Sequence, residues 1–143
     1  MAIGSCFCGK VRIETSCQPI TSALCHCYDC RKLTGTLFTY SFVFKRADIE
    51  ITGSPKEIVK SSESGNTIKN LFCPDCGTPL YGYRIEPSGA ADEIVIVRAG
   101  IFDELELLNA RRPVAELFIN GRVNWMCPLD GTAQFEGMPP LPL

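Results

Sequence analysis

Cys73-Pro74-Asp75-Cys76-Gly77 presents two thiols on one tight turn, in which proline fixes φ and glycine relieves the backbone after the second cysteine. A second doublet near the N-terminus, Cys6-Phe7-Cys8-Gly9, also ends in glycine. Two doublets supply the four sulfurs that a closed tetrahedral zinc site requires. The sequence therefore predicts a structural zinc that ties the N-terminus to the middle of the chain and restricts the unfolded state. Its expected ligands are Cys6, Cys8, Cys73 and Cys76.

A third cluster, Cys25-His26-Cys27-Tyr28-Asp29-Cys30, supplies three more sulfurs. Three thiolates and Zn²⁺ carry a net negative charge, which suits the binding of an exogenous thiolate better than the generation of hydroxide. A free fourth position would make the site catalytic, whereas a fourth protein ligand would make it purely structural. We expect Cys25, Cys27 and Cys30 to be both metal ligands and catalytic residues.

The candidates for a fourth protein ligand are His26, Cys17 and Cys127. His26 lies between two expected ligands and is expected to point away from the metal that they share. Cys17 and Cys127 are isolated in the sequence, and we expect both to be small buried apolar residues, since free cysteine often has that role. Whether one of the three closes the site stays open at this point.

The composition is that of an ordinary globular protein: of 143 residues, 45% are apolar and 21% charged, which predicts one domain over residues 1–143. A formal net charge of −2 argues against nucleic acid as a partner, because phosphate recognition needs a basic face. The sequence has no apolar run long enough for a membrane helix and no basic, apolar secretory signal. An odd number of closely spaced cysteines favours metal ligation over disulfides, and hence the reducing cytoplasm.

Many short segments rich in β-branched, aromatic or alternating apolar residues predict an all-β assembly with turns between the strands. The expected strands are 11–15, 39–44, 48–52, 56–60, 67–72, 80–85, 93–99 and 114–119. Helix is expected only at Tyr28–Thr34, ended by Gly35, and at Glu104–Ala110. The tail from Pro128 onward, which ends in Pro-Pro-Leu-Pro-Leu, is expected to be extended.

Three stretches together resemble the glutathione-dependent formaldehyde-activating enzyme family, which also includes centromere protein V. They are Cys6–Gly9 (Cys-x-Cys-Gly), Cys25–Gly35 (Cys-His-Cys-x-x-Cys-Arg-Lys-x-x-Gly) and Phe72–Leu80 (Phe-Cys-x-x-Cys-Gly-x-x-Leu). Farther along, residues 99–103, Pro113 and Trp125 are similar to the family's Ala-Gly-x-x-Asp, proline and tryptophan. The resemblance extends over nearly the whole chain, to about Trp125.

The resemblance implies a zinc-stapled β-tent of short antiparallel sheets with little helix, and two zinc ions on the cysteine sets given above. It implies a carbon–sulfur lyase that adds glutathione to formaldehyde and gives S-hydroxymethylglutathione. Two positions depart from the family pattern. Glu116 stands where many members carry a histidine after the downstream proline, and residues around Lys69 and Asn70 replace an arginine common before the Phe-Cys pair.

The first functional hypothesis is thus a zinc-dependent lyase acting on a small-molecule thiol such as glutathione and on formaldehyde or a related aldehyde. His26 or Tyr28 would relay the proton, and Arg31 or Lys32 would hold a substrate carboxylate. The second hypothesis is a non-catalytic interaction module with both zinc ions structural. The third is a redox or metal-storage protein with labile thiols. We expect two zinc ions per chain, with the three-cysteine site emptied more readily.

Overall fold

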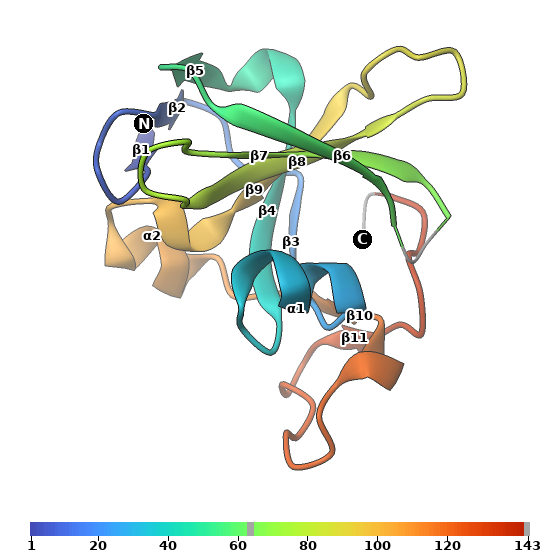
Figure 1. Cartoon of the computed structure of the whole chain (residues 1–143). Helices are drawn as coiled ribbons and strands as arrows, with labels where there is room; N and C mark the ends of the chain where they lie inside the picture. Colours follow the sequence, from blue (N-terminus) through green and yellow to red (C-terminus); the bar gives the residue numbers. More distant parts are fainter. Residues whose placement is uncertain (63–64, 142–143) are drawn as a thin grey trace.

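Two β-sheets form the frame of the protein in a computed structural model that describes residues 1–62 and 65–141. The small sheet has the order β1-β2-β5, and the large sheet has the order β11-β10-β3-β4-β9-β8-β7-β6. In Figure 1, the small sheet lies beside the N-terminus, and helix α1 lies below the strands β6, β7 and β8. The small sheet comprises β1 (Ala2–Ser5), β2 (Arg12–Thr15) and β5 (Glu50–Thr52).

The remaining elements belong to the large sheet or connect its strands. Its strands are β3 (Thr21–Cys25), β4 (Thr39–Lys45), β6 (Lys56–Ser61), β7 (Thr67–Phe72), β8 (Pro79–Ile85), β9 (Ile94–Arg98), β10 (Ala115–Leu117) and β11 (Ala133–Gln134). The α-helices are α1 (Tyr28–Thr34) and α2 (Leu105–Ala110), and the short 3₁₀ turns are Arg46–Asp48, Ala99–Ile101 and Ile119–Gly121.

The predicted all-β class with little helix is confirmed. Each predicted strand and each predicted helix corresponds to an observed element, and the helix over Tyr28–Thr34 ends at Gly35, whose φ of 70° is the left-handed cap conformation. Strands β1, β3 and β11 were not predicted. They are short and have no clear apolar alternation, so that pairing with neighbouring strands decides their conformation.

Two strand pairs contradict the expected antiparallel arrangement. Strand β10 runs parallel to β3 and to β11, while the other strand pairs in the described residues are antiparallel. Parallel neighbours require long connections, and the chain provides them between β3 and β10 and between β10 and β11. The tail from Pro128 onward is accordingly not wholly extended, because it turns at Leu129–Thr132 before β11. Pro142 and Leu143 lie outside the described residues.

Side-chain alternation gives the large sheet two different faces. On β4, Phe42 and Phe44 are buried in the main hydrophobic cluster, which also includes Ile13 of the small sheet. Ser41 and Val43, on the opposite face of β4, line a pocket. The same period of two applies to β9, where Val95 and Val97 are in the cluster and Ile96 and Arg98 are in the pocket. The core thus lies between the two sheets, and the pocket lies on the far face of the large one.

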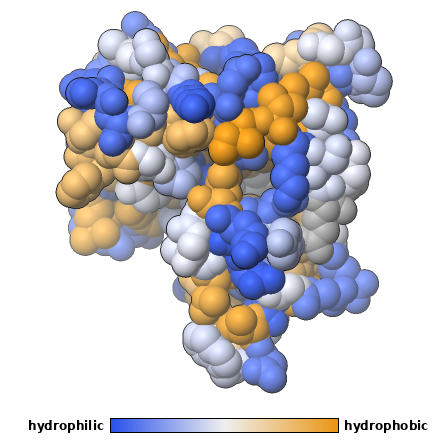
Figure 2. All heavy atoms as spheres, in the orientation of Figure 1, coloured by the Kyte–Doolittle hydropathy of each residue, from blue (hydrophilic) through white to orange (hydrophobic). Residues whose placement is uncertain are grey.

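The surface of the protein agrees with a core that lies between the two sheets. On the face seen in Figure 1, hydrophilic side chains are widespread and apolar residues gather in small groups between them (Figure 2). Both α-helices in the described chain are too short to cross a lipid bilayer.

Candidate metal centres and their pocket

The first cysteine cluster brings together Cys6, Cys8, Cys73 and Cys76, whose sulfur atoms all lie within 4.8 Å of one another. The Cys6 and Cys8 sulfurs are 3.6 Å apart, and those of Cys8 and Cys73 are 3.7 Å apart. A tetrahedral zinc with Zn–S bonds of about 2.3 Å requires sulfurs about 3.8 Å from one another. The spacing and the donor set therefore both fit a closed zinc site.

Local hydrogen bonds hold these sulfurs in place. The backbone N–H of Val11 donates to the Cys6 sulfur at 3.3 Å, and the Cys76 sulfur lies 3.2 Å from the Thr78 hydroxyl. Hydrogen bonds from Thr78 lower the pKa of Cys76 and favour its thiolate form. Gly77 has a φ of 77°, as expected for the turn that follows the second cysteine.

The second cluster comprises Cys25, Cys27 and Cys30, also with sulfurs within 4.8 Å of one another. Cys25 ends β3, and Cys27 is the N-cap of α1, where its sulfur accepts a hydrogen bond from the Cys30 N–H at 3.2 Å. The first turn of the helix then returns Cys30 to the other two sulfurs. Strand end, cap and first turn together explain why this spacing produces a three-sulfur cluster.

Close contact makes simultaneous ionisation of the three thiols unfavourable without a cation. Contact with Cys27 and Cys30 raises the pKa of Cys25, while contact with Cys25 and Cys27 lowers the pKa of Cys30. The Thr39 hydroxyl donates to the Cys30 sulfur at 3.3 Å and supports that thiolate. A soft divalent cation would allow all three to ionise, so this cluster too fits zinc.

The three candidate fourth ligands belong to neither cluster. His26 is fully buried, but its Nε2 atom contacts Glu116 Oε1 at 2.8 Å, as expected for a ring that points away from the cysteines. Cys17 and Cys127 are exposed, so the prediction that both are buried is wrong. None of the nine cysteines, which all lie within the described residues, forms a disulfide.

Glu116 has a role that the sequence alone did not reveal. It is 1% exposed and accepts hydrogen bonds from the Leu129 N–H and from Gln134 Nε2, both at 2.8 Å. Burial raises the pKa of this carboxyl, but the hydrogen bonds from Gln134, His26 and Leu129, together with Arg122, outweigh it and lower the pKa to about 2. Glu116 is therefore ionised at neutral pH and joins the Cys-His-Cys loop to the C-terminal segment.

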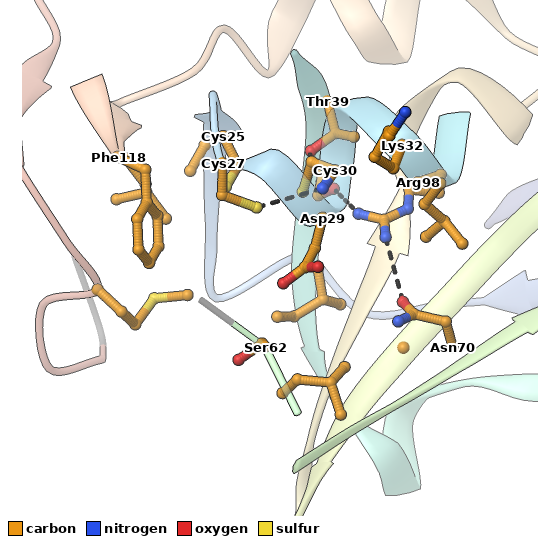
Figure 3. Close-up of a pocket in the computed structure, with 18 of the residues that line it drawn as sticks. Cys25, Cys27, Asp29, Cys30, Lys32, Thr39, Ser62, Asn70, Arg98 and Phe118 are labelled. Atoms are coloured by element: carbon orange, nitrogen blue, oxygen red, sulfur yellow. Dashed lines mark hydrogen bonds between the residues drawn. The ribbon is translucent and has the colours of Figure 1, made fainter. Parts of the chain in front are cut away.

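A cavity of about 320 Å³ opens beside the second cluster and is lined by all three of its cysteines. In Figure 3, the cysteines lie along one side, Phe118 stands near them, and Arg98 extends toward Cys30. Strands β3, β4, β8 and β9 contribute further lining residues. The three sulfurs thus face a space in which a small molecule fits.

Arg98 is a pocket residue that the sequence analysis missed. Its Nη1 donates to the Ser41 hydroxyl at 3.2 Å, and its Nη2 donates to Asn70 Oδ1 at 3.4 Å. In the sequence, Arg98 is simply the polar residue that ends the apolar strand β9. Its hydrogen-bond partners lie on β4 and β7, which are distant in the sequence. Asn70 departs from the family pattern, and this departure is the one signal in the sequence that points to Arg98.

Of the residues predicted to bind a carboxylate or to relay a proton, only some line the pocket. Lys32 lines the pocket, whereas Arg31 does not, and both cations lie over the Tyr28 ring, at 5.8 Å for Arg31 and 5.9 Å for Lys32. Neither His26 nor Tyr28 is among the lining residues, so the geometry gives no support to either as a proton relay.

Comparisons with known proteins agree with the fold and the cysteine pattern. A family model described as glutathione-dependent formaldehyde-activating enzyme matches residues 1–121. A crystal structure of a Rhodobacter sphaeroides protein is similar, with a TM-score of 0.54 and 20% sequence identity. The similarity covers 78% of this chain and 96% of that one, and it bears on the fold alone.

Proposed function

Because this chain belongs to the glutathione-dependent formaldehyde-activating enzyme family, we propose that it is a zinc-dependent carbon–sulfur lyase. It interconverts glutathione and formaldehyde, or a related aldehyde, with S-hydroxymethylglutathione. The observation that carries the proposal is the three-sulfur cluster on the pocket wall, to which the described chain adds no fourth cysteine, histidine or carboxylate ligand. The four-sulfur cluster has the complementary role of a closed structural zinc site.

The reaction needs no oxidant or reductant. A bond forms between the thiol sulfur and the aldehyde carbon, the carbon–oxygen π bond breaks, and the oxygen takes up one proton for the one that the thiol loses. Zinc bound by Cys25, Cys27 and Cys30 would lower the pKa of a coordinated thiol, so that its sulfur is nucleophilic at neutral pH.

The remaining contribution comes from the pocket itself. Val43, Ile96 and Leu117 give it apolar walls, which limit water around the reacting atoms. Thr39 holds the Cys30 sulfur through its hydroxyl. Confining thiol and aldehyde in one small cavity supplies rate through positioning. Clustered cysteines that hold zinc suit a reducing compartment such as the cytoplasm.

Purified zinc-loaded protein is expected to accelerate the addition of glutathione to formaldehyde in proportion to its concentration. The exchange between free formaldehyde and the adduct can be measured by NMR with ¹³C-labelled formaldehyde, against the spontaneous rate in the same buffer. Cys17→Ser, in an exposed residue outside both clusters, is the control and should keep the full rate. Protein with two zinc ions per chain and no rate above the spontaneous reaction would contradict this substrate assignment.

A further inference from the structure

We propose that Arg98 binds a carboxylate of the thiol substrate and makes the pocket selective for anionic over neutral thiols. This inference rests on the proposed function, because it takes the ligand of the pocket to be a thiol. It assigns to a residue of β9 the carboxylate-binding role that the sequence had suggested for Arg31 or Lys32.

The fold fixes the position of the Arg98 guanidinium. Arg98 and Ser41 are direct partners in the antiparallel pairing of β9 with β4, so that their side chains share the pocket face. Asn70 reaches the guanidinium from β7, across Gly82 of β8, with which it is paired. A methyl group at Gly82 would lie 2.7 Å from Asn70 Oδ1, so glycine leaves the space that the amide occupies. Two anchors on two strands therefore hold the guanidinium in one orientation.

No carboxylate in the described residues forms an ion pair with Arg98, and the acidic group on which its charge acts is the Cys30 thiol. The two hydrogen-bond acceptors of Arg98, Ser41 and Asn70, are both neutral. Its Nε atom is buried and has no hydrogen-bond partner. A guanidinium has five N–H donors, of which the anchors use two. A half-buried cation with donors to spare and apolar neighbours is stabilised by an anionic ligand.

The other cations of the pocket are less suited to this role. Lys60 is paired with Asp29 at 2.6 Å, and Lys32 is exposed to water. Arg98 and the three cysteines of the second cluster line the same cavity. A thiol whose sulfur meets the cysteine cluster therefore has Arg98 within the same cavity. A planar guanidinium matches a carboxylate in two parallel hydrogen bonds, so a carboxylate on a short thiol is the group that fits.

The test compares two small thiols, 3-mercaptopropionate and 2-mercaptoethanol, binding to the zinc-loaded full chain in calorimetry without aldehyde. The wild-type protein is expected to bind the carboxylate thiol about 10- to 100-fold more tightly, the range typical of a charged hydrogen bond. Arg98→Met should reduce this preference to within about 3-fold, with zinc content and circular dichroism unchanged. Arg98→Lys, which keeps the charge but not the planar fork, should retain part of the preference and serves if Arg98→Met does not fold.

Lys32→Met is the matched control, because it removes another cation from the same pocket, and it should leave the preference intact. The proposal is overturned if Arg98→Met keeps the preference, weakens both thiols equally or loses zinc, since Arg98 would then act on the reacting centre or the cluster. It is also overturned if Lys32→Met abolishes the preference or if the wild type binds neither thiol. A retained preference without any acceleration of aldehyde addition would contradict the proposed function alone.

Discussion

Cys73→Ser is expected to leave the chain largely unfolded. Cys73 is fully buried directly after β7, where it faces the N-terminal doublet across the four-sulfur cluster. A serine hydroxyl does not ionise at neutral pH and cannot replace the thiolate ligand. Structural zinc contributes about 10–16 kcal/mol in small zinc domains, which is of the same size as the total stability of a typical domain, about 5–15 kcal/mol. Far-UV circular dichroism and thermal unfolding measure the loss.

Cys127→Ser supplies the comparison for this effect, because Cys127 is exposed and belongs to neither cluster. Its free energy of unfolding is expected to stay within about 0.5 kcal/mol of the wild-type value. Strong chelation of the wild-type protein should reproduce the Cys73→Ser result. A Cys73→Ser protein that melts cooperatively near the wild-type temperature would show that the four-sulfur site is not needed for the fold.

Cys27→Ser is expected to have the opposite pattern, with the fold kept and the activity lost. Cys27 is the N-cap of α1, and serine is among the best N-cap residues, so its hydroxyl can accept the Cys30 N–H in place of the sulfur. The second cluster, however, is reduced to two thiols. Zinc content should fall from about two ions per chain to about one, and the rate of glutathione addition should fall by more than about 100-fold.

The two readouts of this variant separate its possible outcomes. Metal analysis reports the second site, and circular dichroism reports the fold, so that a loss of rate in an unfolded protein cannot be mistaken for a loss of chemistry. A Cys27→Ser protein with the wild-type rate would place the reaction elsewhere. In that case the cysteine cluster would have no catalytic role.

Local patterns in the sequence were enough to predict helix α1 and the composition of both cysteine clusters. The helix over Tyr28–Thr34 is defined by its cap and by Gly35, and the cysteines within each doublet and within the triplet are only two or three residues apart. The two doublets are 65 residues apart, and they are paired because a closed zinc site requires four ligands. The helix, the doublets and the triplet depend on neighbours in the sequence. They are therefore visible without knowledge of the fold.

The surroundings of Glu116 and Arg98 could not be predicted, because they depend on the pairing of strands that are distant in the sequence. Glu116 meets His26 because β10 runs parallel to β3, in a register that sets Glu116 beside Leu24. Arg98 faces the pocket because it pairs with Ser41. A shift of one residue in either register would turn these side chains to the other face. Periodicity predicts that a strand exists, but it does not predict which strand lies next to it.

The open coordination position is tested most directly by zinc-edge X-ray absorption of the two-zinc protein with and without glutathione. One closed four-sulfur site and one open three-sulfur site average about 3.5 sulfurs per zinc, and a bound thiolate should raise the average to about 4. Cys27→Ser, with one zinc, should show about four sulfurs and no response to glutathione. A wild-type spectrum with about four sulfurs per zinc from the start, unchanged by glutathione, would contradict the account and favour a binding module with two structural metals.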